Sequence, residues 1–243
     1  MFEQSPHFHF EQLDSTNNYA STIAKLPETR TGTAITADFQ LEGRGQRDNK
    51  WLAAAGSSFL GTLIIKAQLN PEDIFYLSKW AALQVAKTLI QQDIQRVSIK
   101  WPNDIFVEGK KIGGILIENS WSDQKLHYSL IGIGINLSAS PTENATNFSE
   151  HSKEVPSTVD FLQTLRRQMD ADYFLLEGNN WKEIDLQYHS LLFQKEEWKE
   201  YQIAKDESTF IGKIIQVEAD GKLLLEKEDQ SSLGFFMKEI IFK

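Results

Sequence analysis

Gly43-Arg44-Gly45-Gln46-Arg47-Asp48-Asn49-Lys50-Trp51 is a short basic segment in an otherwise acidic chain. Residues 43–50 hold three cations and one anion, whereas the 243-residue protein has a formal net charge of −9. The two glycines permit positive φ angles and let a ligand approach the backbone. Arg44 and Arg47 add permanent, forked positive charge, and Trp51 offers a flat face for stacking. The segment is therefore a candidate anion-binding loop, although an ordinary solvated loop could have the same composition.

The composition limits the class of protein. The length suits one large domain, or a main domain with a small appendix. The chain has no cysteine, which excludes disulfides, thiolate metal sites and a thioester on the enzyme itself. No histidine has metal-ligand spacing, so we expect no metal held by protein ligands alone. The N-terminus lacks the pattern of a signal peptide and no apolar run could span a membrane, so we expect a cytoplasmic protein without membrane association. The negative charge argues against nucleic acid as the main partner.

Apolar periodicity and turn residues predict a chain of alternating strands and helices. We expect strands at 7–12, 33–38, 58–66, 96–100, 104–108, 111–118 and 126–137. Helices are expected at 17–25, 70–91, 157–177 and 180–193. His7 and His9 alternate with Phe8 and Phe10, which is typical of an edge strand with one wet face.

Three less regular regions complete the prediction. Residues 119–124 resemble a polar connection, and residues 138–156 a loop of low hydrophobicity. From Trp198 onward the pattern changes to short strands near 209–218, 222–227, 233–237 and 239–242. We interpret this tail as a small appendix resembling a β-barrel.

Asp14-Ser15-Thr16-Asn17 lies at the expected junction between the first strand and the first helix. Hydroxyl and amide groups at a helix start can cap the helix, and they can equally bind a small polar ligand. Gln40, just before the basic segment, both donates and accepts hydrogen bonds, as recognition of an amide or ureido group requires.

Lys100-Trp101-Pro102-Asn103-Asp104 places a lysine at the end of a predicted strand, followed by a rigid turn. A compact ammonium there suits a carboxylate or phosphate oxygen that changes charge during a reaction. A surface lysine at a strand end is the alternative.

Two further predicted strands, at residues 111–118 and 132–137, contain glycines in their interior. Glycine inside a strand often marks close approach by a ligand or another backbone. The second segment, Gly132-Ile133-Gly134-Ile135-Asn136-Leu137, imitates a dinucleotide-binding fingerprint, but Leu137 replaces its third glycine and no helix start follows. We therefore reject a Rossmann site, and no P-loop motif is present.

Taken jointly and in this order, these motifs closely resemble the biotin protein ligases, also called biotin–[acetyl-CoA-carboxylase] ligases. The resemblance rests on D-S-T-N at 14–17, Q-x-x-G-R-G-x-R at 40–47, K-W-P-N-D at 100–104, K-x-G-G-I-L-x-E at 111–118 and G-x-G-I-N at 132–136. It implies an α+β fold with a mixed, mainly antiparallel sheet flanked by helices, of the class II synthetase and biotin ligase type. A catalytic biotin- and ATP-binding domain is expected at 1–196, and a small C-terminal SH3-like β-barrel at 197–243.

The resemblance also implies a two-step reaction. The carboxylate of biotin attacks the α-phosphorus of ATP, which gives biotinyl-5′-AMP and pyrophosphate, with Mg²⁺ at the phosphates. A lysine of the biotin carboxyl carrier protein, a subunit of acetyl-CoA carboxylase, then displaces AMP. The motif at 14–17 leaves no room for the N-terminal DNA-binding domain of larger members, so we expect a ligase without repressor function. The chain is expected to be a monomer or a homodimer.

Residue roles follow from the same resemblance, position by position. Arg44 and Lys100 are the expected catalytic residues. The expected biotin contacts are Ser15, Thr16, Asn17, Gln40, Arg44, Gly45, Gln46, Lys100, Gly132 and Gly134. The expected nucleotide contacts are Arg47, Asn49, Trp51, Lys111 and Asn136.

The basic segment departs from that of some family members, where Arg, Gly and Arg stand at the positions of Gln46, Asp48 and Asn49. This difference predicts a weaker hold on the adenylate. Two alternatives stay open: a lipoate-type protein ligase, and a non-catalytic module that senses biotin. Gln40 and the residues at 14–17 favour a polar ureido head over a dithiolane.

Overall fold

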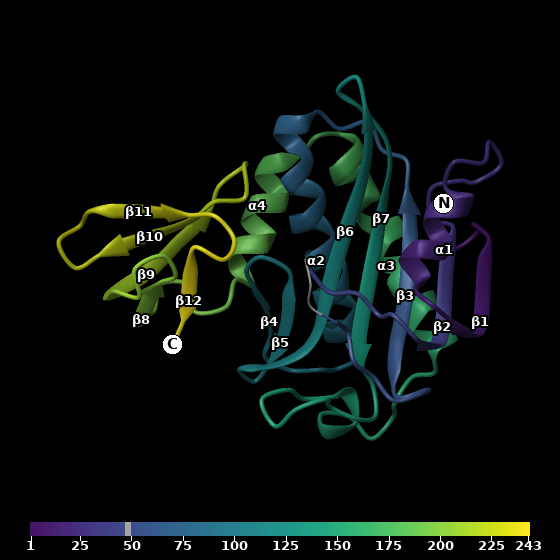
Figure 1. The fold of residues 1–243 in the computed structure, drawn as a ribbon, viewed down its shortest axis with the longest axis horizontal. Helices are drawn as coiled ribbons and strands as arrows, with labels where there is room; N and C mark the ends of the chain where they lie inside the picture. The colour runs from purple at the N-terminus through teal and green to yellow at the C-terminus, as the bar shows by residue number, and fades with distance from the viewer. Residues whose placement is uncertain (47–49) are drawn as a thin grey trace.

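A mixed seven-stranded sheet forms the centre of the protein, and a five-stranded antiparallel sheet lies beside it (Figure 1). The computed structural model describes residues 1–46 and 50–243. The large sheet has the strand order β1-β2-β3-β7-β6-β5-β4, in which β1 and β2 are parallel and the other neighbours antiparallel. The predicted fold class, a mixed and mainly antiparallel sheet flanked by helices, is confirmed. Its strands are β1 (His7–Leu13), β2 (Ala34–Gln40), β3 (Ser58–Ile65), β4 (Val97–Lys100), β5 (Asp104–Val107), β6 (Lys110–Ser122) and β7 (Lys125–Asn136).

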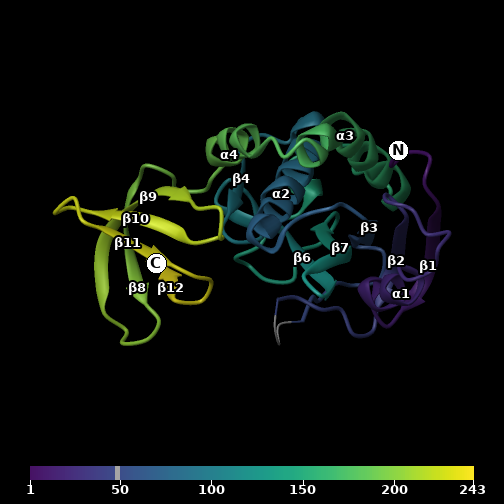
Figure 2. The same cartoon turned by 90° about the horizontal axis from the view of Figure 1, so that it is seen from above.

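Helices cover both faces of the large sheet, as the view from above shows (Figure 2). Three long helices lie on one face, and α1 lies on the other against β2, β3 and β7. The helices are α1 (Thr16–Ile23), α2 (Ile74–Gln91), α3 (Thr158–Glu177) and α4 (Trp181–Ser190), with short 3₁₀ turns η1 (Pro71–Asp73) and η2 (Phe148–Glu150). None of the helices in the described part of the chain is long and apolar enough to cross a membrane.

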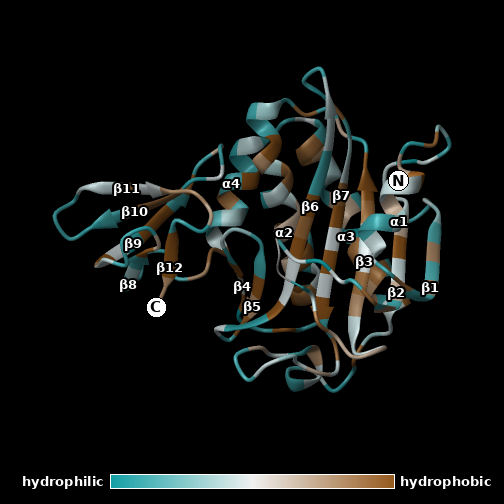
Figure 3. Cartoon of the chain, viewed as in Figure 1, coloured by the Kyte–Doolittle hydropathy of each residue, from teal (hydrophilic) through white to brown (hydrophobic). Residues whose placement is uncertain are grey.

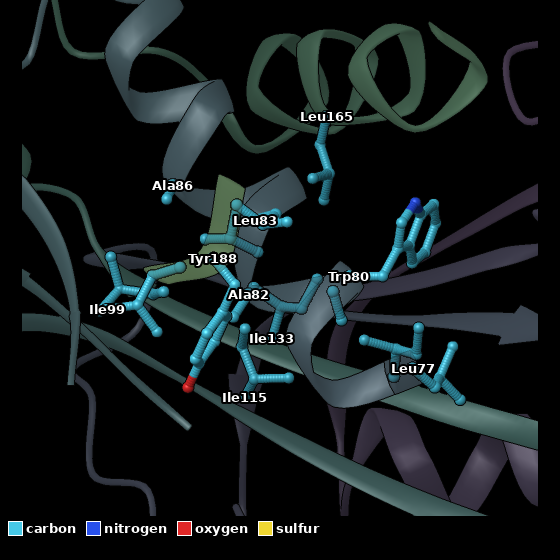
Figure 4. Packing of buried hydrophobic residues seen from close by; sticks show 14 of the residues in the cluster. Leu77, Trp80, Ala82, Leu83, Ala86, Ile99, Ile115, Ile133, Leu165 and Tyr188 are labelled. Atoms are coloured by element: carbon cyan, nitrogen blue, oxygen red, sulfur yellow. The ribbon is translucent and has the colours of Figure 1, made fainter. Parts of the chain in front are cut away.

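The hydrophobic core lies between the large sheet and its three-helix face (Figure 4). Leu77, Trp80 and Leu83 of α2 are fully buried there and pack with Ile133 of β7. Each fully buried leucine or isoleucine side chain contributes about 1.5–3 kcal/mol to folding relative to an exposed one. Every residue of β3 is buried, and Figure 3 shows that it is more hydrophobic than the edge strand β1.

The predicted edge strand is confirmed, because β1 is the outer strand of the large sheet. The predicted polar connection at 119–124 is wrong. Strand β6 continues to Ser122, and only Asp123 and Gln124 turn the chain into β7. Both residues have positive φ, 47° and 62°, as the tight turn of a two-residue hairpin requires.

The C-terminal tail forms an antiparallel sheet of order β11-β10-β9-β8-β12. The four predicted strands are confirmed, and a fifth, β8, was not predicted as a strand. Its residues do not alternate strictly between apolar and polar, and Trp198 is exposed. Within the described residues no ladder joins β11 to β12, so the expected barrel is not closed. The strands are β8 (Trp198–Ile203), β9 (Thr209–Val217), β10 (Leu223–Lys227), β11 (Ser232–Phe235) and β12 (Ile240–Phe242).

Candidate active site

A pocket of about 170 Å³ lies on the α1 side of the large sheet, over β3, β7 and β6. Most of the residues expected to bind ligand line it: Ser15, Thr16, Asn17, Gln40, Arg44, Gly45, Gln46, Trp51, Lys111, Gly132 and Gly134. The sequence motifs therefore converge on one place. Arg47 and Asn49, two expected nucleotide contacts, lie outside the described residues.

One end of the pocket is a network of neutral polar groups. The backbone N–H and the hydroxyl of Thr16 both lie within hydrogen-bond distance of Gln40 Oε1, at 2.7 Å and 3.0 Å. The buried hydroxyl of Thr62 lies 2.8 Å from Thr16 Oγ1 and 2.5 Å from Asn17 Oδ1. These bonds fix the side-chain orientations, and among the described residues no acceptor takes the Nε2 protons of Gln40. This end can thus hydrogen-bond a neutral polar ring without rearranging.

The start of α1 shows which groups of the D-S-T-N motif the helix itself uses. Ser15 occupies the N-cap position with extended φ, yet its side chain makes no capping hydrogen bond. Asp14 accepts a hydrogen bond from the amide of Asn18 at 2.6 Å, and this bond is the main cause of the lowered pKa of Asp14. The hydroxyl of Ser15 is therefore not used to cap the helix, and Ser15 lines the pocket.

The other end of the pocket carries charge. Lys111 Nζ lies 2.6 Å from Asp104 Oδ1, and Arg44 Nη2 lies 2.8 Å from Glu118 Oε2. Lys50 also lines the pocket, and its backbone pairs with that of Arg44. Arg44 and Lys50 come from the loop between β2 and β3, and Lys111 comes from β6, yet all three cations line the same pocket. Such a set can offset the repulsion between two anions brought together for reaction.

Glycines in β7 make space for the two side chains that cover the strand. A Cβ on Gly132 would lie 2.5 Å from Asn17 Oδ1, and a Cβ on Gly134 would lie 2.6 Å from the indole of Trp51. The strand glycines are thus required by close approach, as the sequence predicted. Here the atoms that approach belong to the protein itself.

A second hollow of about 420 Å³ shares Gln40, Lys50 and Trp51 with the first. Three polar atoms near it are buried and have no hydrogen-bond partner within the described chain: Trp51 Nε1, Ser58 Oγ and Asn136 Oδ1. Ser58 lines this hollow and pairs with Asn136 across the β3–β7 ladder. Asn136 itself lines neither hollow, and its amide donates to the carbonyl of Thr146 at 2.9 Å. Buried groups without partners leave hydrogen-bonding capacity for a ligand.

Lys100, an expected catalytic residue and biotin contact, does not line the pocket. Its ammonium lies 5.0 Å, 5.9 Å and 4.8 Å from the ring centroids of Phe106, Phe193 and Phe242. Burial lowers the pKa of this ammonium more than nearby Asp104 raises it. The sequence identified the motif but not the direction of this side chain.

Several residues at the site were not assigned a role from the sequence. Lys50, Asn103 and Asp104 line the pocket, whereas Thr62 and Glu118 hydrogen-bond to residues that line it. Asp104 and Glu118 belong to motifs that the resemblance had already identified, so their acidic side chains were available as a signal. Thr62 carried no such signal, because it lies in a strand that reads as wholly apolar core. Within the described residues no group of three or more acidic, histidine or cysteine side chains could hold a metal ion.

Comparisons with known proteins agree on one family. Its sequence model, described as the biotin/lipoate A/B protein ligase family, matches residues 9–136. A biotin–[acetyl-CoA-carboxylase] ligase from Paracoccus denitrificans is 38% identical over 137 residues, which cover 55% of this chain and 55% of that protein. The bifunctional ligase/repressor BirA of Escherichia coli is 29% identical over 133 residues, which cover 55% of this chain and 41% of that protein. The matches thus span about half the length of these relatives.

A similar fold occurs in the biotin protein ligase from Aquifex aeolicus, solved in complex with biotin and ATP. The two structures superpose with a TM-score of 0.75 over 98% of both chains, at 24% sequence identity. The five-stranded sheet is therefore part of the shared fold.

Proposed function

Since the chain belongs to the biotin/lipoate A/B protein ligase family, we propose that it is a biotin–protein ligase that uses ATP and forms AMP. The observation that carries the proposal is the division of one pocket into a neutral hydrogen-bonding end and a cationic end. The Thr16–Asn17–Gln40–Thr62 network suits the ureido ring of biotin, which presents both N–H donors and a carbonyl acceptor. The cationic end suits the carboxylate of biotin and the α-phosphate of ATP.

In the first step an oxygen of the biotin carboxylate attacks the α-phosphorus. The bond from that phosphorus to the oxygen bridging to the β-phosphate breaks, and pyrophosphate leaves with the bonding electrons. Lys111 and Arg44 reduce the repulsion between the two anions, because both cations face the space where the anions meet. Each cation exchanges a protein carboxylate, Asp104 or Glu118, for a substrate oxygen. The product is biotinyl-5′-AMP.

Trp51 supports a separate place for the nucleobase. Its indole stands between the pocket and the second hollow, so a purine could stack on its outer face. Ser58 lines that hollow, and its Oγ has no hydrogen-bond partner in the described part of the chain, so it could bond to the base. Asp104 supplies a single carboxylate, a donor set that suits Mg²⁺ brought in by a triphosphate. When bound, Mg²⁺ would offset phosphate charge.

In the second step a lysine amine of a carrier protein attacks the carbonyl carbon of the mixed anhydride. The bond from that carbon to the phosphate oxygen breaks, AMP leaves, and the nitrogen loses a proton to give an amide. We propose the biotin carboxyl carrier protein of acetyl-CoA carboxylase as the acceptor, supported by the activity named for the Paracoccus relative. A chain of net charge −9 suits a ligase with no repressor role on DNA.

One experiment tests the whole proposal. The purified protein is incubated with biotin, Mg-ATP and a carrier domain; pyrophosphate is measured, and the carrier is probed with streptavidin. Pyrophosphate release that requires biotin, followed by labelling of the carrier, is expected. A carrier whose acceptor lysine is changed to arginine must stay unlabelled.

The same assay with lipoic acid separates the nearest alternative. A dithiolane ring cannot satisfy the amide of Gln40 or the hydroxyl of Ser15, so burying it there would leave polar groups unpaired. Turnover with lipoic acid at the rate found with biotin would contradict the proposed specificity. Binding of biotin with no pyrophosphate release would indicate a sensing module.

A further inference from the structure

The K-W-P-N-D segment has two sides. Lys100 and Trp101 contact the five-stranded sheet, whereas Asn103 and Asp104 line the pocket. Figure 1 shows β4 and β5 at the side of the large sheet next to the five-stranded sheet. One short turn therefore connects the C-terminal sheet to the charged end of the candidate site.

Lys100 joins the turn to the last strand of the chain. Its ammonium lies 4.8 Å from the ring of Phe242 in β12, and Phe106 and Phe193 supply two further rings. A cation over aromatic faces is attracted by their quadrupoles, and the attraction grows when the group is partly desolvated. These contacts explain why a lysine is present at this position without any contact to a substrate.

Trp101 makes the second connection. Its indole Nε1 donates a buried hydrogen bond of 2.9 Å to the carbonyl of Gly221, in the turn between β9 and β10. Gly221 has a φ of +88°, and a Cβ there would lie 2.5 Å from the ring of Phe75 in α2. The turn is thus seated closely against the large domain, in a conformation that favours glycine.

The end of β9, which leads into the turn at Gly221, is bound by side chains of two helices. The fully buried Lys79 of α2 donates to the carbonyl of Val217 at 2.8 Å and pairs with Asp185 of α4 at 2.5 Å. The N–H of Val217 donates to His189 Nε2 at 2.9 Å. Both backbone polar groups of one residue are therefore bound by side chains of two helices, so the position of Gly221 is well defined.

On the pocket side, the turn fixes the charged end. Asn103 Nδ2 donates to the carbonyl of Ile115 at 2.8 Å, and the N–H of Ile115 donates to the carbonyl of Asn103 at 2.9 Å. Asp104 then holds Lys111 at 2.6 Å. A displacement of the turn would move this ion pair. The Thr16–Gln40 network lies on the same face of the sheet but beyond β7, over β2 and β3, and would not move with the turn.

We propose that Lys100 and Trp101 are positioning residues, which hold the Asn103–Asp104 turn to the C-terminal sheet and thereby place Lys111 for the nucleotide. The kinetic consequence rests on the proposed ligase function; the structural consequence does not. The five-stranded sheet thus stabilises the position of active-site residues, although it contributes no residue to the pocket lining.

Two substitutions test the proposal with little change of shape. Lys100→Met removes the charge and keeps the aliphatic stem, and Trp101→Phe removes the indole donor. Each is expected to raise the KM for Mg-ATP in biotin-dependent pyrophosphate release by about three- to tenfold. The dissociation constant for biotin alone should stay within about twofold of wild type, because its expected contacts are on the neutral end. Lys100→Arg, which keeps a cation over the rings, should restore the KM.

A matched control and a partner test sharpen the result. Lys110→Met, at the exposed lysine that begins β6, should leave both constants unchanged. Lys100→Met and Phe242→Leu should be less than additive, because both remove the same contact. Full additivity, or a loss of biotin affinity equal to the loss for ATP, would overturn the proposal in favour of general destabilisation.

Hydrogen exchange gives an answer that does not depend on turnover. The amide of Ile115, which donates to Asn103, should exchange about three- to tenfold faster in both variants. The amide of Ile133, in the middle of the sheet, should keep its wild-type rate. An unchanged rate at Ile115 would reject the proposal even if activity fell. If wild-type protein released no pyrophosphate, the ligase function would fail, while the exchange rates would still decide the role of Lys100 and Trp101.

Discussion

The two ends of the pocket are built on different principles. At the neutral end Thr16 and Thr62 are buried and Gln40 is half-buried, and their side chains hydrogen-bond to one another. The charged end is more open: the side chains of Arg44 and Lys111 are 41% and 38% exposed, and each pairs with a carboxylate of the protein. The neutral end is complete before a ligand arrives, whereas the charged end must exchange partners when anions enter.

This difference predicts a division of labour. A preorganised neutral network supports recognition, because leaving any of its groups unpaired costs about 1–3 kcal/mol. Cations that exchange a carboxylate for a substrate oxygen support the chemical step, because their effect grows as charge develops. Substitutions at the two ends should therefore affect different constants.

The largest effect is expected for Lys111→Ala. Loss of this cation should lower the rate of biotin-dependent pyrophosphate release by about 10²–10³-fold, because a charge that faces the reacting atoms is removed. The affinity for biotin, measured by calorimetry without ATP, should change little. Lys110→Ala is the matched control, since Lys110 is exposed and lines no part of the pocket. A parallel collapse of biotin binding would show that the two ends are not separable.

Arg44→Ala should have the next largest effect, chiefly on the KM for Mg-ATP. Loss of a charge-assisted contact to phosphate should raise that KM by about 10- to 100-fold. Arg96→Ala, which removes an arginine whose side chain is 78% exposed and paired only with Glu108, is the control and should match wild type. An unchanged KM in the Arg44 variant would remove this residue from the nucleotide site.

Thr16→Val tests the neutral end with a side chain of nearly equal size. Gln40 Oε1 loses one of its two donors and Thr62 loses a neighbour, so the affinity for biotin should fall by about tenfold. The rate of adenylate formation at saturating biotin should stay near that of wild type. Thr22→Val, at an exposed threonine of the same helix, controls for helix propensity. A lower saturating rate with unchanged affinity would reverse the assignment of the two ends.

Ionic strength should produce the smallest effect and acts without any mutation. Raising salt from about 0.05 M to about 0.5 M shortens the screening length severalfold, so the KM for Mg-ATP should rise by about threefold. The dissociation constant for biotin should move less, because the neutral network carries no net charge. Titration calorimetry and pyrophosphate release at constant free Mg²⁺ measure the two quantities. Equal shifts in both would contradict the contrast between the ends.

Much of this site could be predicted from the sequence. Five motifs separated by many residues all reach one pocket, because glycines and turn residues mark the places where strands and loops must leave space or bend. The strand and helix order was also readable from apolar periodicity, including the edge position of β1. Gln46, Asp48 and Asn49 differ from the residues of some family members. The weaker binding of the adenylate that this difference predicts stays a prediction.

The failures have a common physical origin in contacts between distant parts of the chain. The direction of Lys100 depends on Phe242 and Phe193, which come from outside the motif. The role of Thr62 depends on its neighbours across the sheet, and no periodicity reveals them. Strand β8 was missed because its partners β9 and β12, rather than its own pattern, define it.

Glu118 gives the molecule a property that neither end has alone. A single oxygen, Oε2, accepts from the amide of Asn17 at 2.6 Å and from the guanidinium of Arg44 at 2.8 Å. When an anion draws Arg44 away, that oxygen keeps Asn17 as its remaining described partner, and the amide of Asn17 meets a less neutralised acceptor. Occupancy of one end therefore alters the binding free energy at the other, and by thermodynamic linkage the alteration is equal in both directions. If the proposed function is correct, one shared oxygen thus couples the affinities of the two ligands.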